Sequence, residues 1–425
     1  MPGIIVGCNG RDIAPPGAVP TTTEDSAGVV VVRSPFPAWR AGSGWTVDSL
    51  PDVEIGRESG PQEFLLSGVT SIVMFDGGPI VIGNRGYARR APGPEGVINS
   101  SPRGRGDHTI RYFNLDGRVA AIAGGVGDAP HELRQLGGLY RVGEEVWAMQ
   151  RFPHPMKVFS RTGSSVRSAD LSASIGRLAV AIGTIGEGAL AISETVTGVP
   201  QPRPGELGLH LKRVLTLSRS GELDSLLVVP YLQHVGQKEG GSALQAYGAV
   251  NVTRAGRRAI YTSWSADPPV QVLDASGKTT RIIRWNADRH AVTEDDKAAY
   301  RRQLLKTAPS LPPPVRARRE YQATTMAFPE HHPVLTWIIE DDAGNLWVQR
   351  QPRPHRGTAG VSNDDRLSPT QWDVFDPRGA WLAPVSVPAG LKPQLIGKDH
   401  VVGVWQDENG VEYVRMHGIR RNAQP

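Results

Sequence analysis

The chain has 425 residues, of which 39 % are hydrophobic, with 49 Gly, 35 Pro and 10 Trp. This apolar content excludes a disordered chain, and the abundance of Gly and Pro between short apolar runs favours an all-β protein made of strands and turns. The 47 Lys and Arg against 42 Asp and Glu leave a net charge of +5, which bears on solubility and does not argue for nucleic-acid binding.

The N-terminal segment, residues 1–27, holds the single cysteine, Cys8, so no disulfide can form within the chain. The sequence Ile5-Val6-Gly7-Cys8 resembles the lipobox of bacterial lipoproteins, in which the cysteine becomes acylated. No Lys or Arg precedes Cys8, and the apolar stretch is too short for a signal peptide, so this interpretation needs a true start upstream of Met1. The alternative is a chance exposed cysteine at an untargeted terminus. Under the lipobox interpretation, Asn9 to Ser26 is a flexible tether and the protein belongs to the bacterial cell envelope.

A repeated pattern begins at residue 54. Glu54 to Phe64 (EIGRESGPQEF) recurs in loosened form at Gly125 to Leu133 (GVGDAPHEL). A second signal is an apolar pair followed by a polar stretch that ends in Gly, which predicts a β-hairpin. Clear copies end at Gly117, Gly163, Gly221, Gly277 and Gly379, and a weaker copy ends at Gly418. Such internal repetition predicts a repeat architecture rather than separate domains.

The spacing of the hairpins indicates a β-propeller. The five clear glycines lie 46, 58, 56 and 102 residues apart, and a blade needs about 40 to 50 residues. Further apolar runs are expected to form inner strands at Glu144 to Ala148, Glu187 to Ile192, Arg257 to Tyr261 and Gly344 to Val348. Because the chain stops shortly after Gly418, Trp45 to Ile55 is expected to complete the last blade. Residues 28–422 then make six blades. Five would need a false hairpin signal, and seven would need a blade hidden in the longest interval.

That longest interval contains a predicted helical and Pro-rich insertion at about 287–322. Thr293 and Asp296 form a capping-box-like start, and Pro309 with the run Pro312 to Pro314 is expected to end the helix. The insertion is predicted to lie over one face of the ring. Two more long loops are expected at 86–107 and 351–369, and such loops on a rigid scaffold are where binding usually resides.

The loop Gly-x-x-x-Gly-Pro-x-Glu-Phe, the hairpin Val374 to Gly379 and the hairpin Asp342 to Val348 together resemble bacterial six-bladed β-propellers of the NHL-repeat-like group. The resemblance covers approximately Val29 to Arg421. It departs from the pattern at Leu217 and Leu273, where Phe is usual. Members that resemble this chain are often envelope lipoproteins of unassigned role, so the resemblance implies a fold and a location but no reaction.

No catalytic constellation emerges from the sequence. A calcium site of the lactonase type would need oxygen ligands, but Glu63 and Glu132 occupy equivalent repeat positions, which favours a structural role. His331 and His332 are adjacent, so on a strand they point to opposite faces and do not readily share a metal. Asp341 to Asn345 is interpreted as a hairpin turn rather than a calcium loop. Trp147 and Trp347 are expected in the core.

Two functions follow from these observations. The leading one is a non-enzymatic binding or scaffolding propeller that presents a ring face and long loops to a protein, peptide or glycan, with no cofactor. The low-weight binding-loop candidates are Arg89, Arg90, Arg103, Arg105, His331 and His332. The alternative is a metal-dependent hydrolase or lyase of the lactonase-like type, for which calcium is the expected ion. Nucleic-acid binding is disfavoured because few aromatic residues lie among these arginines, and a lipid at Cys8 would be the only membrane link.

Overall fold

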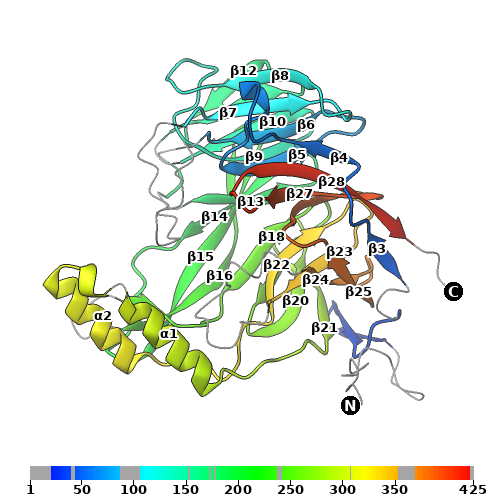
Figure 1. The fold of residues 1–425 in the computed structure, drawn as a ribbon. Coiled ribbons are helices and arrows are strands. Elements are labelled where there is room, and N and C mark those ends of the chain that lie inside the picture. Colours follow the sequence, from blue (N-terminus) through cyan, green and yellow to red (C-terminus); the bar gives the residue numbers. More distant parts are fainter. Residues whose placement is uncertain are drawn as a thin grey trace, which may run out of the picture.

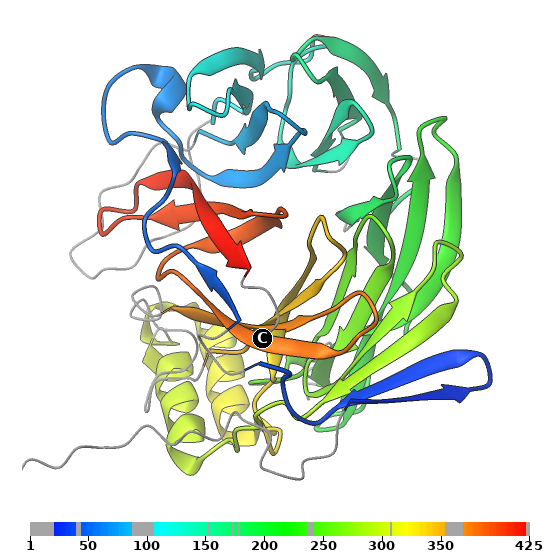
Figure 2. The same ribbon diagram turned by 90° about the vertical axis from the view of Figure 1, so that its right-hand side faces the viewer.

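The computed structural model describes residues 21–39, 44–86, 106–151, 154–171, 174–176, 179–236, 242–306, 308–352 and 369–421. Within them the protein is mainly β with two α-helices, and its antiparallel sheets are arranged like the blades of a propeller (Figure 1 and Figure 2). The innermost strands of the blades contact one another in cyclic order, from β5 through β9, β13, β18, β22 and β26 back to β5. This arrangement confirms the predicted propeller-like, mainly β fold.

The first three blades follow the chain. Blade 1 contains β5 (Val69–Met74), β6 (Ile80–Asn84), β7 (Thr109–Phe113) and β8 (Val119–Gly124). Blade 2 contains β9 (Leu136–Val142), β10 (Glu145–Gln150), β11 (Met156–Ser160) and β12 (Ser165–Ala169). Blade 3 contains β13 (Val180–Ile185), β14 (Ala189–Thr195), β15 (Leu207–Ser218), β16 (Leu223–Gly236) and the short β17 (Ser242–Leu244).

Blade 4 contains β18 (Asn251–Ala255), β19 (Ile260–Trp264), β20 (Asp267–Leu273) and β21 (Thr279–Trp285). On its outer edge β2 (Val29–Ser34) pairs in parallel with β21, and β1 (Thr22–Ser26) pairs with β2. A single parallel pair, Gly183 with Ala255, joins blades 3 and 4 into one hydrogen-bonded sheet of 11 strands. Residues 22–26, which we expected to belong to a flexible tether, therefore form a strand.

Blade 5 contains β22 (Leu335–Glu340), β23 (Leu346–Arg350), β24 (Thr370–Phe375) and β25 (Trp381–Val387). Blade 6 contains β26 (Lys392–Ile396), β27 (His400–Gln406) and β28 (Glu412–Arg421). Its outer strand comes from the other end of the chain, because β3 (Trp45–Val47) and β4 (Val53–Ile55) both pair with β28. The predicted pairing of 45–55 with the last blade is thus seen in the structure.

Turn chemistry explains why the hairpin signal located the outer strands. Gly117, Gly163, Gly221, Gly277 and Gly379 all have positive φ, in the turn between the third and fourth strands of a blade. Each turn is closed by the same backbone bonds; for example, Gly117 N donates to Asn114 O at 2.9 Å. The weaker sixth copy is wrong, since Gly418 lies inside β28, paired with His400. The four further apolar runs, which were expected to form inner strands, are the second strands of blades 2 to 5 and lie next to the innermost strands.

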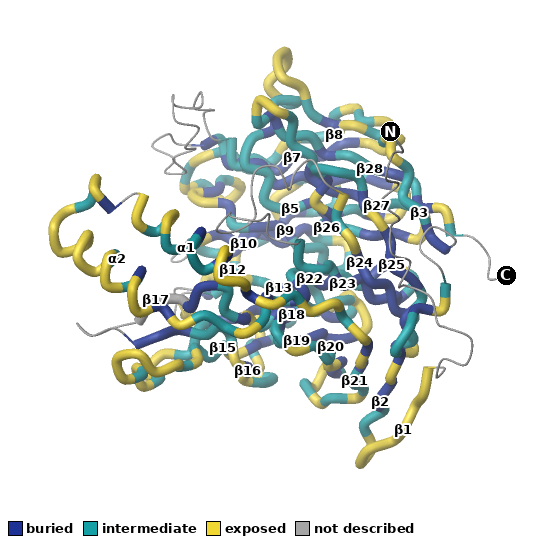
Figure 3. Tube along the Cα trace, turned by 60° about the horizontal axis from the view of Figure 1, so that its bottom comes forward, coloured by how far each residue is buried: buried dark blue, intermediate teal, exposed yellow. Residues whose placement is uncertain are grey.

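The hydrophobic core is divided among the blade interfaces. Six clusters of buried side chains occur, one between each pair of neighbouring blades. Trp147 packs between blades 2 and 3, and Trp347 packs between blades 5 and 6; both are almost wholly buried, as predicted. Figure 3 shows this distribution, with buried segments inside the ring and exposed ones on the helices and β1. Face-to-face packing of sheets therefore supplies the core.

The insertion contains two helices rather than one, α1 (Glu294–Lys306) and α2 (Pro313–Thr325), with a short 3₁₀ turn at Ala308–Ser310 between them. Another 3₁₀ turn, Gln62–Phe64, precedes β5. The predicted capping box is present, because Thr293 N donates to Asp296 Oδ2 at 2.9 Å and Asp296 N donates to Thr293 Oγ1 at 3.2 Å. The helix α1 ends at Lys306, before Pro309, as predicted, but the run Pro312 to Pro314 begins α2, because N–H groups in the first turn of a helix have no internal partner. Among the described helices, none is long and apolar enough to cross a membrane.

Strand direction sorts the connections onto two faces. The turns between first and second strands and between third and fourth strands are short and lie on one face, which we call the turn face. The other face, the loop face, carries the connections between blades and between second and third strands. It includes the helical insertion and the extension of the β15–β16 hairpin, which lie on the same side of the ring in Figure 1. The long insertions described here therefore lie on the loop face.

Candidate functional site

An axial channel of about 910 Å³ runs between the blades. Every innermost strand contributes to its wall: β5, β9, β13, β18, β22 and β26. The volume falls within the roughly 300–1,000 Å³ of small-ligand sites. Because all six innermost strands contribute residues, the site is assembled from parts of the chain more than three hundred positions apart, and the channel is the candidate functional site.

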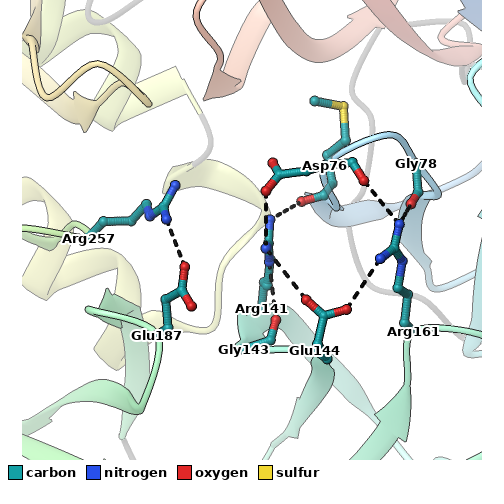
Figure 4. A network of polar contacts seen from close by, with 9 residues as sticks. Asp76, Gly78, Arg141, Gly143, Glu144, Arg161, Glu187 and Arg257 are labelled. Carbon is teal, nitrogen blue, oxygen red and sulfur yellow. Dashed lines mark hydrogen bonds and ion pairs between the residues drawn. The ribbon is translucent and has the colours of Figure 1, made fainter.

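Paired charges lie on the turn face (Figure 4), and Arg141, Glu187 and Arg257 among them line the channel. Arg161 Nη1 lies 3.3 Å from Glu144 Oε2, while Arg141 Nη2 lies 3.7 Å from Asp76 Oδ2. Arg141 Nη1 also donates to the Met74 carbonyl at 3.2 Å, so these groups connect blades 1 and 2. The rim at this end is therefore a set of mutually satisfied ions.

A further ion pair on the same rim connects blades 3 and 4. Arg257 Nη2 donates to Glu187 Oε1 at 2.8 Å, and both residues follow innermost strands (Figure 4). Both side chains are at least half exposed, so water screens the pair, and we expect its contribution to stability to be at most about 1 kcal/mol. Its main effect is to neutralise Arg257 at the channel mouth.

Inside the channel, Arg254 of β18 stacks on Trp337 of β22. The guanidinium carbon lies 3.5 Å from the centre of the indole ring, which is within cation–π range. Arg254 Nη1 donates to the carbonyl of Thr253 at 3.1 Å. Burial lowers the pKa of Arg254 to about 10, and its proximity to the Tyr140 hydroxyl opposes that shift. Tyr140 itself donates to the Ala181 carbonyl at 2.9 Å, so blades 2 to 5 all meet around this arginine.

Uncharged polar side chains cover the exposed edges of the innermost strands. Gln394 Oε1 accepts the N–H of Ile72 at 2.9 Å, and Thr336 donates to Gln349 Oε1 at 3.1 Å. The Gln394 bond joins blade 6 to blade 1, and all four residues line the channel. Hydroxyl and amide groups therefore stand where the strand edges would otherwise present unpaired backbone groups to the axis.

Glu340, at the end of β22, is the most deeply buried carboxylate of the channel wall, with 2 % of its side chain exposed. Its Oε2 accepts the N–H of Arg258 at 3.2 Å, and the Arg258 guanidinium Nε lies 3.9 Å from Oε1. Burial raises the pKa of Glu340 above its usual range, despite the opposing effect of these donors. The environment of this carboxyl therefore disfavours its ionised form.

Of the sequence-predicted candidates, the two that the structure describes, His331 and His332, do not line the channel. His332 is buried under α1, where its Nε2 lies 3.3 Å from Asp296 Oδ2 and its ring contacts Tyr247. His331 is half-buried and forms an isolated bridge with Ala291. The two histidines therefore have separate environments. Cys8 and the four arginines, Arg89, Arg90, Arg103 and Arg105, lie outside the described residues.

The proposed calcium ligands of the alternative do not converge. Glu63 lies in the 3₁₀ turn Gln62–Phe64, and Glu132 accepts the N–H of Ala129 at 2.9 Å in its own loop. Asp341 to Asn345 forms a hairpin turn, closed by a bond from Gly344 N to Asp341 O at 2.8 Å, as predicted. Within the described ranges, no group of three or more His, Cys, Asp or Glu side chains is arranged to hold a metal ion.

No known protein family matches the sequence, and no curated protein matches it significantly. Solved structures do match. A DUF4221-family member from Bacteroides vulgatus covers 89 % of this chain and 99 % of its own, with 10 % identity and a TM-score of 0.50. A candidate exported protein from Bacteroides fragilis is more distant, with 9 % identity and a TM-score of 0.45; the match covers 92 % of this chain and 100 % of that one. The virginiamycin B lyase of Staphylococcus aureus is also more distant, with 10 % identity and a TM-score of 0.38; the match covers 89 % of this chain and 100 % of the lyase. The chain thus has a β-propeller fold similar to that of bacterial proteins.

Proposed function

We propose that the protein is a non-enzymatic binding propeller of the bacterial cell envelope that takes a peptide or glycan into its axial channel from the loop face. The observation that carries this proposal is the 910 Å³ channel, whose wall is built by all six innermost strands. Ligand sites typically combine apolar walls with a few oriented polar groups. Ile72, Ile338 and Leu391 supply apolar wall, while Thr336 and Gln394 supply polar groups.

The asymmetry of the two faces supports entry from the loop face. On the turn face, Arg141, Arg161 and Arg257 are already paired with carboxylates. The longer connections, including α1 and α2, stand on the opposite face. Variable loops on a rigid scaffold are the usual carriers of recognition, so these segments would contact the parts of a ligand that extend beyond the channel.

Blocking the channel tests this function. Thr184 of β13 lines the channel, and within the described residues its side chain makes no hydrogen bond that the substitution would break, so Thr184→Trp should narrow the channel while keeping the fold. Thr23→Trp places the same ring on the exposed strand β1 and serves as the matched control. On peptide and glycan arrays, the ligand of the native protein should be lost with Thr184→Trp and retained with Thr23→Trp. Equal binding by both variants would refute a channel site.

The envelope location rests on the sequence Ile5-Val6-Gly7-Cys8. Incorporation of labelled palmitate into the native protein, and its loss in Cys8→Ser, would support a lipid anchor. If the native protein incorporates no label and fractionates in the same way as Cys8→Ser, the proposed envelope location would be refuted, while the proposed binding in the channel would be unaffected.

A further inference from the structure

Arg254 differs from the other arginines of the channel wall. Arg141 and Arg257 each have a carboxylate partner at the turn face. Arg254 has none among the described residues: its Nη1 donates to a backbone carbonyl, and its buried Nε has no hydrogen-bond partner. A cation that is partly withdrawn from water without a counter-charge is costly, so its position calls for an anion that the protein itself does not supply.

A second cation, Lys212 of β15, adds to the positive charge around Arg254. Its Nζ lies 3.6 Å from the centre of the Tyr231 ring, and no carboxylate partner is found for it in the described chain. Burial and the nearby charge of Arg254 lower the pKa of Lys212 to about 8. Lys392, at the start of β26, also lines the channel. Cations from two blades, Lys212 of blade 3 and Arg254 of blade 4, therefore lie close enough to influence each other.

The stacking on Trp337 gives Arg254 a defined orientation. A guanidinium held flat on an indole keeps its donors in a fixed plane, which suits the planar, bidentate geometry of a carboxylate. Thr336 and Gln349 lie beside this ring on β22 and β23, and both line the channel. Hydroxyl and amide groups next to a fixed cation are suited to a ligand that carries hydroxyl groups as well as an acid.

We propose that Arg254, oriented by Trp337, is the anion-recognising residue of the channel and that the ligand carries a carboxylate on a hydroxylated body, as an acidic saccharide does. This inference rests on the proposed function, because it names the ligand class of the same channel. Lys212 supplies additional positive charge near Arg254, and carboxylates at the rim neutralise Arg141 and Arg257.

The test compares a galacturonic-acid trimer with its methyl ester, which has the same sugar body without the charge. Titration calorimetry on the whole chain should show binding of the acid and at least about tenfold weaker binding of the ester, as expected for loss of a charge-assisted hydrogen bond. Arg254→Gln should weaken acid binding by a similar factor, whereas Arg118→Gln, which removes an exposed, carboxylate-paired arginine in the β7–β8 turn away from the channel lining, should leave it unchanged. Equal affinity for acid and ester would overturn the inference.

Two further outcomes separate this inference from the proposed function. If a neutral glycan or peptide binds the native protein and is blocked by Thr184→Trp but not by Arg254→Gln, the channel function stands and the carboxylate inference falls. Inorganic phosphate competing better than the uronate would also overturn the carboxylate assignment. Should Arg254→Gln fail to fold, the acid and ester comparison on the native protein decides.

Discussion

Asp341 is predicted to be the most sensitive single carboxylate in the protein. Its side chain is wholly buried, and it accepts bonds from Asn345 N at 2.8 Å, Trp347 Nε1 at 3.1 Å and Arg421 Nη2 at 2.9 Å. It thereby ties a blade 5 hairpin to the end of β28. In Asp341→Asn the charge is lost and one acceptor becomes a donor that faces other donors. Removing one partner of a buried ion pair costs about 3–5 kcal/mol, and because Arg421 is partly exposed we expect about 3 kcal/mol.

The assay is reversible unfolding by denaturant and by heat. With an unfolding entropy of about 2 cal/mol/K per residue, a cooperative unit of about 400 residues shifts by roughly 1.2 °C per kcal/mol, so Asp341→Asn should lower Tm by about 4 °C. The matched control is Asp376→Asn: its carboxylate accepts two backbone N–H bonds in a hairpin turn, and no arginine of the described ranges pairs with it. It should cost about 1 kcal/mol or less. Equal effects of both substitutions would refute the role assigned to the buried pair.

Three other predictions concern the wall and the closure of the ring. Burial raises the folded-state pKa of Glu340, so the folded state binds a proton more tightly than the unfolded state, and the contribution of this group to stability falls as pH rises above about 4.5. Glu340→Gln should therefore flatten the dependence of the melting temperature on pH and be more stable than the native protein at about pH 8. A less stable variant at that pH would contradict this. Gly183 has a φ of +135°, and a Cβ atom at this position would lie 2.1 Å from a carbonyl oxygen of β18. Gly183→Ala should therefore lower the free energy of unfolding by about 3 kcal/mol. Gly186 also has a positive φ but has open space around its Cβ position, so Gly186→Ala should lower it by only about 1 kcal/mol. Ile55→Asp should place an unpaired carboxylate in the interface that closes the ring and lower the free energy of unfolding by about 4 kcal/mol. Aggregation through the exposed edge of β28 should then increase light scattering. The control Glu54→Gln, at the neighbouring residue, should lower the free energy of unfolding in denaturant by less than about 1 kcal/mol.

Local turn chemistry made the outer strands predictable. A positive-φ glycine after a polar turn is dictated by the turn itself, so the five hairpins could be placed without knowledge of their neighbours. The pairing of 45–55 with the last blade could be predicted because a missing strand leaves an exposed edge. The second helix was missed because the proline run was interpreted as a terminator, although proline also fits a helix start.

The candidate site could not be predicted in the same way. Arg254 and Trp337 are separated by most of blade 4 and the helical insertion, and they meet only because β18 and β22 are neighbours around the axis. The innermost strands themselves carried no repeated signal. One clue was present in the sequence: Arg254 stands in the short β-branched run Asn251 to Ala255, where an arginine is unusual unless it faces a channel.

The shared sheet of blade 6 also has a consequence during synthesis. The chain emerges from the ribosome at about 5–20 residues per second, and β28 follows β4 by more than 350 residues. The strands β3 and β4 are therefore synthesised on the order of 20–70 seconds before their partner β28 exists. Until then blade 1 has no neighbour on one side, and its apolar residues toward blade 6, among them Leu66 and Ile80, lack the covering that the finished ring gives them. The nascent protein is thus most exposed to chaperones and to aggregation while its last blade is still untranslated.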